Sequence, residues 1–130
     1  MLFRSNQVIP TISNAIVMDR GKFLLILKDL DESLKELINA DYPIKAVILR
    51  FSRDKVSFFN RIHQKIQEMN VIYSGADLEI VFNIDYLIEP LTNLPNEIGE
   101  INFSVTGEDK PGVITAQDYT YIILPMKLPD

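Results

Sequence analysis

The amino-acid sequence predicts an α+β fold in a single domain, and three observations carry this prediction. The chain has 130 residues, about the size of one domain. Apolar residues make up 47% of it and charged residues 24%, as is usual for a chain that buries one core. Strand-like and helix-like patterns alternate in the order strand, helix, strands, helix, strands. We therefore expect residues 1–130 to form one domain in which two helices pack on antiparallel β-sheets.

The first helix is predicted within residues 20–39, after a short strand around Gln7–Ile9 that ends at Pro10. Its apolar residues recur at steps of three and four, as on one face of a helix. This stripe consists of Phe23, Ile26, Leu27, Leu30, Leu34, Leu37 and Ile38. Leu24–Leu25 fall outside the stripe, so they could cover a second surface, or the segment before Asp29 could instead be extended. The helix should stop before Asp41–Pro43, because a residue that precedes proline avoids helical conformation.

Most of the remaining chain has the alternating pattern of strands. The predicted strands are Ala46–Phe51, Val56–Asn60, Leu78–Phe82, Ile101–Val105, Val113–Ile114 and Tyr119–Leu124. Ser52–Lys55 is a tight turn that makes a hairpin of the first two, and Gly107–Gly112 is a second turn. Arg61–Tyr73 fits a helix and a long, bulged strand about equally well.

A second, short helix is predicted to follow the 78–82 strand and to reach Leu94. The candidate N-caps are Asn83 and Asp85. The apolar positions that suggest a buried stripe are Tyr86, Leu87 and Leu91. Pro90 removes one backbone hydrogen bond, so we expect a kink, or a helix that begins at or after Ile88.

Composition excludes several classes of function. Eighteen acidic residues against thirteen Lys and Arg give a net charge of −5, so bulk charge does not favour nucleic acid. Without cysteine there are no disulfides, thiolate nucleophiles or Cys-ligated zinc. The longest apolar run, Phe23–Leu27, is far shorter than the roughly 18–20 residues of a membrane span. No secretory leader is recognisable, so an intracellular location without a membrane partner is expected.

The sequence shows no convincing catalytic or metal-binding group. His63 is the sole histidine, and its nearest charged neighbours in sequence are cations. Asp77, Glu79 and Asp85 come nearest to a carboxylate cluster. Asp77 and Glu79 share one face of a strand and could hold Mg²⁺ in a hydrolase, but a solvated sheet face explains them equally well. We predict no catalytic residue, no metal and no cofactor. Spacing alone leaves the function undetermined.

Four segments resemble a known family in their order and nearly in their spacing. They are Gln7–Pro10 (QVIP), Ala46–Ser52 (AVILRFS), Tyr73–Asn83 (YSGADLEIVFN) and Tyr119–Leu128 (YTYIILPMKL). Together they resemble the third, C-terminal domain of the bacterial sliding clamp, the β subunit of DNA polymerase III, over about residues 7–128. The resemblance implies a DNA-clamp fold. The chain departs from the family's pattern at Lys127, where an arginine is usual, and at Pro90 inside the second helix.

The resemblance implies a function without chemistry. A clamp is a homodimeric ring of three-domain protomers that encircles duplex DNA and tethers the polymerase, which raises its effective concentration. DNA polymerase III, the clamp loader and other partners bind it through short peptides, roughly Gln-Leu-x-Leu-Phe, in the bacterial cytoplasm at the nucleoid. A freestanding, clamp-like adaptor that binds such peptides without encircling DNA is the alternative. The sequence encoded upstream of Met1 would distinguish the two.

The resemblance also assigns the third-domain half of the peptide pocket. The matching positions are Val8, Pro111, Ile122, Leu124, Pro125 and Met126. Pro125 ends the last strand because it lacks an N–H, and a flexible methionine suits adaptable recognition. The alternative is that Ile122 and Leu124 are ordinary core residues on one face of that strand.

Contact with DNA is expected to be slight. Clamp helices line the central hole, which makes Lys28 and Lys35, on the polar face of the first helix, the candidate DNA-facing residues. Three acidic residues, Asp31, Glu32 and Glu36, share that face, so a generic solvated helix is the alternative.

We predict that the chain alone does not bind double-stranded DNA appreciably at physiological salt, because it is acidic and cannot close a ring by itself. Fluorescence anisotropy of a labelled duplex measures this. A salt-dependent dissociation constant tighter than about a micromolar, better than typical non-specific binding, would contradict the prediction.

Overall fold

The computed structural model describes residues 2–4 and 15–128. It contains two antiparallel sheets and two α-helices. The five-stranded sheet has the order β1 (Leu2–Arg4), β9 (Tyr119–Ile123), β8 (Gly112–Ala116), β7 (Glu100–Ser104) and β2 (Ala15–Asp19). The four-stranded sheet has the order β5 (Lys65–Asn70), β4 (Lys55–Phe59), β3 (Ala46–Ser52) and β6 (Leu78–Asn83). The helices are α1 (Arg20–Leu34), continued by a 3₁₀ turn at Lys35–Leu37, and α2 (Ile84–Asn93).

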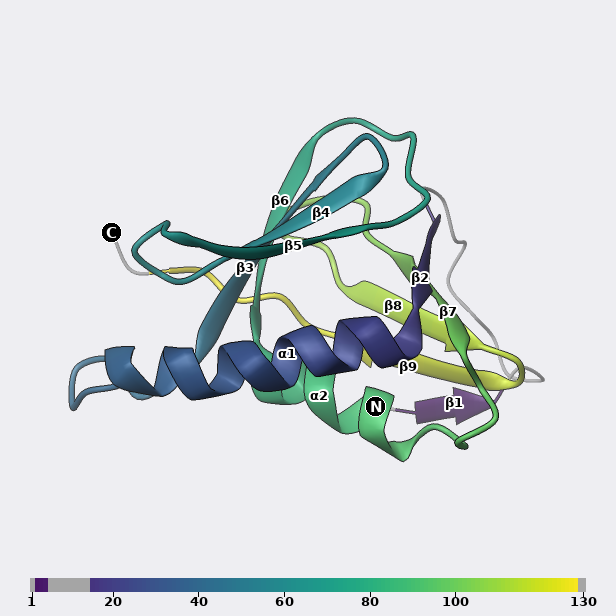
Figure 1. Cartoon of the computed structure of the whole chain (residues 1–130), viewed down its shortest axis with the longest axis horizontal. Helices are drawn as coiled ribbons and strands as arrows, with labels where there is room; N and C mark the ends of the chain where they lie inside the picture. The colour runs from purple at the N-terminus through teal and green to yellow at the C-terminus, as the bar shows by residue number, and fades with distance from the viewer. Residues whose placement is uncertain (1, 5–14, 129–130) are drawn as a thin grey trace.

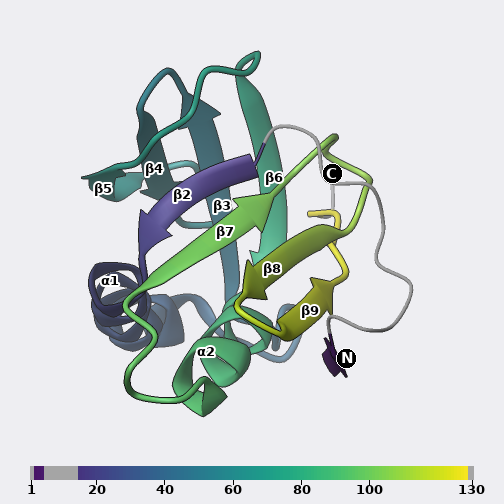
Figure 2. The same ribbon diagram turned by 90° about the vertical axis from the view of Figure 1, so that its right-hand side faces the viewer.

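The two helices pack against each other and cover one side of the sheets. Figure 1 shows α1 and α2 side by side below the strands, and Figure 2 shows the same layering from the side. An isolated bridge pairs Val17 of β2 with Ile72, two residues after the end of β5 in the four-stranded sheet. The predicted α+β class, with two helices on antiparallel sheets, is therefore confirmed. In the described part of the chain, neither helix has the length and apolar character needed to cross a membrane.

Phe103 of β7 is central to the core. Its ring centroid lies 6.1 Å from that of Phe23 on α1, 6.1 Å from Phe51 on β3 and 5.9 Å from Phe82 on β6. All four rings are fully buried, at 0% exposure. A Cβ at Gly112 would lie 2.6 Å from the Phe103 ring, so β8 passes too close for any other residue. One aromatic cluster thus connects α1 with both sheets.

The first predicted helix is confirmed, since α1 and the 3₁₀ turn after it lie within residues 20–39. The Asp19 carboxylate caps α1 by accepting a hydrogen bond from the Lys22 N–H at 2.8 Å. Leu24–Leu25 lie within the helix, so the alternative of an extended start is wrong. Ile38 was wrongly placed in the buried stripe, because the backbone there is already extended and its side chain is 37% exposed.

The second predicted helix begins earlier than the argument from Pro90 allowed. The Asn83 side chain accepts a hydrogen bond from the Asp85 N–H at 3.0 Å and caps α2, which starts at Ile84. A start at or after Ile88 is therefore wrong. Pro90 is accommodated inside the helix, at the loss of the one bond it would donate. Tyr86 is 57% exposed and was wrongly assigned to the buried stripe.

Six of the predicted strands are confirmed to within one or two residues, as β3, β4, β6, β7, β8 and β9. The ambiguous segment 61–73 contains a strand, β5, whose register with β4 shifts between Phe58 and Phe59. The strand expected at Gln7–Ile9 lies outside the described residues. Two strands were not predicted: β1 and β2.

A buried arginine ties α1 to the end of α2. Arg20, the first residue of α1, is 8% exposed and donates five hydrogen bonds of 2.7–3.1 Å to backbone carbonyls. The acceptors are the carbonyl oxygens of Leu91, Leu94, Pro95 and Ile98. Every N–H of the guanidinium donates a hydrogen bond. The acceptors lie at the C-terminal end of α2, where carbonyls lack helical partners and the helix dipole attracts positive charge.

We predict that Arg20→Met destabilises the chain by about 2–4 kcal/mol, because several buried carbonyls lose a charged donor together. The free energy of unfolding in urea measures the loss. Arg53→Met is the control: Arg53 is exposed in the turn between β3 and β4, and this change should stay within about 0.5 kcal/mol. Equal effects of the two changes would contradict the prediction.

Candidate functional site

The chain after β9 passes from one sheet to the other. β9 ends at Ile123, two residues before Pro125, as expected for a residue without a backbone donor. The Met126 N–H then donates to the Val81 carbonyl of β6 at 2.8 Å. Because β6 is the edge of the four-stranded sheet, residues 124–126 connect β9 of the five-stranded sheet to that edge.

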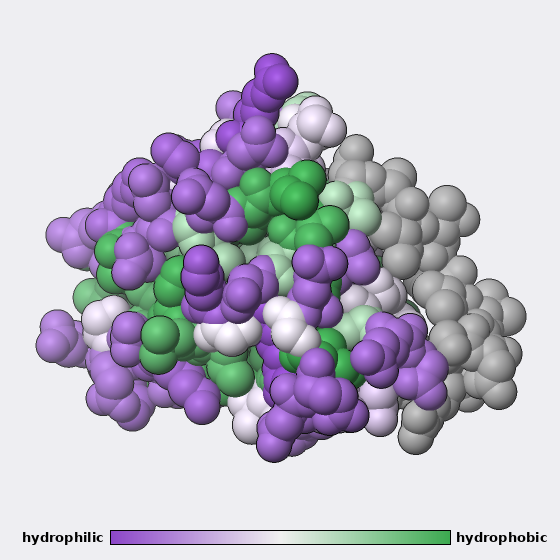
Figure 3. Space-filling view, turned by 45° about the vertical axis from the view of Figure 1, so that its right-hand side comes forward, coloured by the Kyte–Doolittle hydropathy of each residue, from purple (hydrophilic) through white to green (hydrophobic). Residues whose placement is uncertain are grey.

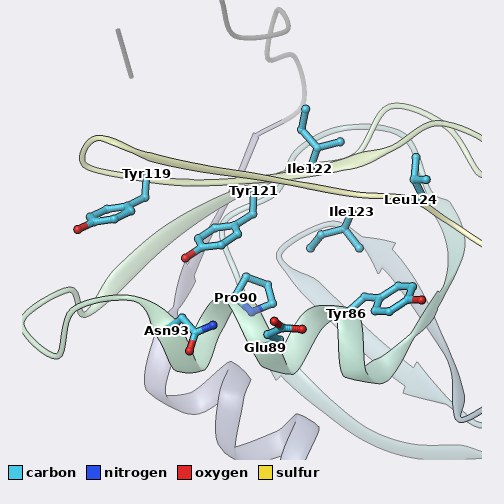
Figure 4. Close-up of a pocket in the computed structure, with 9 residues that line it drawn as sticks. All are labelled: Tyr86, Glu89, Pro90, Asn93, Tyr119, Tyr121, Ile122, Ile123 and Leu124. Atoms are coloured by element: carbon cyan, nitrogen blue, oxygen red, sulfur yellow. The ribbon is translucent and has the colours of Figure 1, made fainter. Parts of the chain in front are cut away.

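From Tyr121 to Leu124, at the end of β9, buried side chains alternate with more exposed ones. Tyr121 and Ile123 are buried at 8% and 4% exposure, whereas Ile122 is half-buried and Leu124 is 68% exposed. Figure 4 shows Tyr121 and Ile123 directed toward α2, and Ile122 and Leu124 directed to the opposite side. The alternative that Ile122 and Leu124 face the core is therefore wrong. Leu124 is an exposed leucine directly after the last residue of β9. The face of the molecule in Figure 3 is largely hydrophilic, with hydrophobic residues gathered in patches.

A groove of about 780 Å³ runs between α2 and β9 (Figure 4). One wall is α2 and the other is β9 with the residue that follows it. The lining residues are Tyr86, Glu89, Pro90, Asn93, Tyr119, Tyr121, Ile122, Ile123 and Leu124. The groove therefore includes two of the predicted pocket residues, Ile122 and Leu124, and extends from them along the helix.

The groove is aromatic and carries one acidic side chain. Burial raises the pKa of the Tyr121 phenol, Tyr119 and Glu89 raise it further, and Arg20 opposes them. Glu89 is the one ionisable carboxylate among the lining residues. These neighbours favour the neutral phenol, so Tyr121 presents an uncharged ring to the groove.

The other predicted pocket residues lie around the end of β9. Pro125 and Met126 are half-buried in the segment that crosses to β6. Pro111 is exposed and directly precedes Gly112, which pairs with Ile123, so it lies at the same end of the β8–β9 hairpin as Leu124. Val8 lies outside the described residues.

The candidate DNA-facing residues lie on a surface of mixed charge. Lys28 and Lys35 are both exposed on the α1 side of the molecule. The Lys35 ammonium lies 2.9 Å from a Glu32 carboxylate oxygen and 4.0 Å from Asp31. Part of the positive charge is thus compensated within the chain.

The carboxylates of Asp77 and Glu79, the candidates for a metal site, are not part of a metal-binding cluster in the described residues. Glu79 accepts hydrogen bonds from the Arg50 guanidinium at 2.9 and 3.1 Å across β3 and β6, and His63 Nε2 lies 3.7 Å away. Across residues 2–4 and 15–128, no group of three His, Asp or Glu side chains is arranged to hold a metal ion. Glu79 lies on an ion-paired sheet face, whereas Asp77 is exposed and precedes the start of β6, so the expectation that both share a strand face is wrong.

Sequence reasoning missed the helix wall of the groove. Tyr86, Glu89, Pro90 and Asn93 recur at the i, i+3, i+4, i+7 spacing that places residues on one helix face. That spacing was available in the sequence. It was obscured because Tyr86 was grouped with Leu87 as a core residue.

The chain matches one family model over residues 6–127, described as "DNA polymerase III beta subunit, C-terminal domain". The chain belongs to this family. The resemblance inferred from its segments is confirmed, and with it the DNA-clamp fold. This family is that of the replicative sliding clamp. The clamp is a processivity factor of DNA polymerase III and is itself non-catalytic, not an enzyme.

Solved structures of sliding clamps from Pseudomonas aeruginosa have the same fold. One DNA polymerase sliding clamp superposes with a TM-score of 0.72, and a structure of the DNA polymerase III subunit beta gives 0.73. A third, solved with griselimycin bound, gives 0.71. Each is 21% identical, and the match covers 93% of this chain but 32–33% of the clamp. Among curated proteins, the sequence search found no match.

We predict that Tyr121→Phe reduces the loss of stability at alkaline pH. The pKa of Tyr121 is raised above its ordinary value of 10.0, so the folded state holds this proton more tightly than the unfolded state. The stabilisation is complete below pH 10 and is lost as the pH rises through the raised pKa. Urea unfolding at a series of pH values measures the slope.

The matched control for this experiment is Tyr86→Phe, which removes a phenol from an exposed position on the same groove. It should leave the slope of stability against pH at its wild-type value. If Tyr121→Phe does the same, the phenol of Tyr121 is not buried as described.

Proposed function

We propose that the chain acts as the C-terminal domain of a replicative sliding clamp and binds the short peptides by which partners attach to it. The observation that supports this most directly is the apolar pair of half-buried Ile122 and exposed Leu124, at the rim of a groove in a domain of the clamp family. The partners are DNA polymerase III, the clamp loader and other clamp-binding proteins.

The apolar pair has the properties of a docking surface. Exposing a leucine costs free energy that a partner recovers by covering it, at roughly 25 cal/mol per Å² of apolar surface. Met126 and Pro125 extend the patch, and the backbone bond from Met126 to Val81 holds them in place. We include Val8 and Pro111 in the proposed pocket, as the resemblance implies. A fixed backbone with flexible apolar side chains suits several related peptides.

Duplex DNA is a partner only of a complete ring in this proposal. A net charge of −5 argues against strong contact with phosphates by the chain alone. Lys28 and Lys35 would then face the DNA weakly, because acidic neighbours share their surface. The function is topological: a homodimeric ring in the bacterial cytoplasm, at the nucleoid, keeps the polymerase close to its template.

We also propose that residues 1–130 are one clamp-like domain and carry half of the peptide pocket. The other half would belong to the second domain of a clamp. Losing about 100–150 Å² of apolar contact corresponds to roughly 2.5–4 kcal/mol, or two to three decades of affinity. A peptide that binds an intact ring at micromolar concentration would bind this chain at about millimolar concentration.

We predict that the double change Leu124→Ser and Met126→Ser abolishes binding of a Gln-Leu-x-Leu-Phe peptide. Both changes remove apolar side chains and keep the backbone N–H that bonds to Val81. Chemical-shift perturbation during peptide titration measures the binding. In the unchanged chain, Val8, Ile122, Leu124 and Met126 should respond.

A matched control is Leu25→Ser, which removes a leucine of similar exposure, 61%, from α1. It should leave peptide binding unchanged, and all variants should still unfold cooperatively. Perturbations that cluster on Asp77 and Glu79 instead would show that the pocket lies elsewhere.

A further inference from the structure

The carboxylate of Glu89 lacks a cationic partner in the groove. No Lys, Arg or His nitrogen of the described residues lies within 4.0 Å of it. The other acidic residue of α2, Asp85, lies one turn earlier and is bound to the Lys45 ammonium at 3.1 Å. Glu89 is therefore the acidic group of α2 that is available to a ligand.

The nearest buried cation cannot neutralise Glu89 through a direct bond. Arg20 is close enough to influence Tyr121, but all of its N–H groups donate to backbone carbonyls beyond Pro90. An arginine has five donors, and the structure uses all five. The negative charge of Glu89 is thus available to interact with a ligand in the groove.

The surroundings of Glu89 favour a cation over other ligands. Three tyrosines line the same groove, at positions 86, 119 and 121, and a tyrosine face attracts ammonium and guanidinium groups. Asn93 adds a side-chain carbonyl one helical turn from Glu89. Aromatic faces, a carboxylate and an amide oxygen together form a site for a lysine or arginine side chain on an apolar stem.

We propose that this groove selects partner peptides that carry a lysine or arginine next to their apolar anchors. The apolar anchors cover Ile122 and Leu124 on the rim, and the basic side chain enters between α2 and β9, where its charge meets Glu89. This inference rests on the proposed function, because the same peptide occupies both places. It adds a rule of specificity: a basic flank strengthens binding, and an acidic flank weakens it.

The test compares peptides that share the anchors and differ only in charge. The probes are Gln-Leu-Ser-Leu-Phe carrying two lysines, or two glutamines, either before or after the anchors, with blocked ends. Chemical-shift titration of the full chain at low salt measures each dissociation constant. We expect a lysine peptide to bind about three- to fivefold more tightly than its glutamine counterpart, as for an exposed ion pair supplemented by cation–π contact.

Two variants locate the effect. Glu89→Gln should remove the preference for lysine, so that lysine and glutamine peptides bind this variant equally well. Glu97→Gln removes the same charge from an exposed loop outside the groove and should keep the preference. If the preference survives Glu89→Gln, the net acidity of the chain causes it and the inference is wrong. Equal binding of lysine and glutamine peptides contradicts the inference alone, whereas no binding by any peptide contradicts the proposed function as well.

Discussion

The arrangement of this domain depends on one buried guanidinium. A charge removed from water is costly unless every polar atom finds a partner, and Arg20 meets this condition with five hydrogen bonds to carbonyls. Those carbonyls belong to the last turn of α2 and the loop after it, where a helix has acceptors but no donors. The first residue of α1 therefore determines where α2 ends, across more than seventy residues of sequence.

The N-terminal end of α2 is also held by a cation, through ion pairs with carboxylates. Lys45, just before β3, forms ion pairs with Asp31 of α1 at 2.5 Å and with Asp85 of α2 at 3.1 Å. The hydrogen bond to Asp31 keeps the pKa of Lys45 above its ordinary value, which favours the charged form. With both of its ends attached to α1, α2 presents a fixed wall to β9. The helix wall of the groove is consequently fixed by the packing of α1 against α2.

The proposed site combines local chemistry with this rigid frame. Pro125 ends β9 because it has no N–H, and the bond from Met126 to Val81 then attaches the chain to the second sheet. The apolar side chains at the end of β9 are exposed because Tyr121 and Ile123 already occupy the inward positions. Successive side chains of a strand point to opposite faces, so Leu124 lies on the face opposite to Tyr121 and Ile123.

The sequence by itself determined the helix and strand content, the clamp family and the residues at the end of β9. The spacing of apolar residues is a local property, and motifs such as Tyr73–Asn83 keep their order along the chain. Both can therefore be recognised without a structure. It misjudged Ile38 and Tyr86, because apolar spacing alone does not show where a neighbouring element covers a helix. Only the tertiary structure decided that Arg20 anchors α2, that Ile122 and Leu124 face outward, and that Glu89 lines a groove with tyrosines from β9. These are contacts between distant segments, whose partners depend on how the sheets and helices pack.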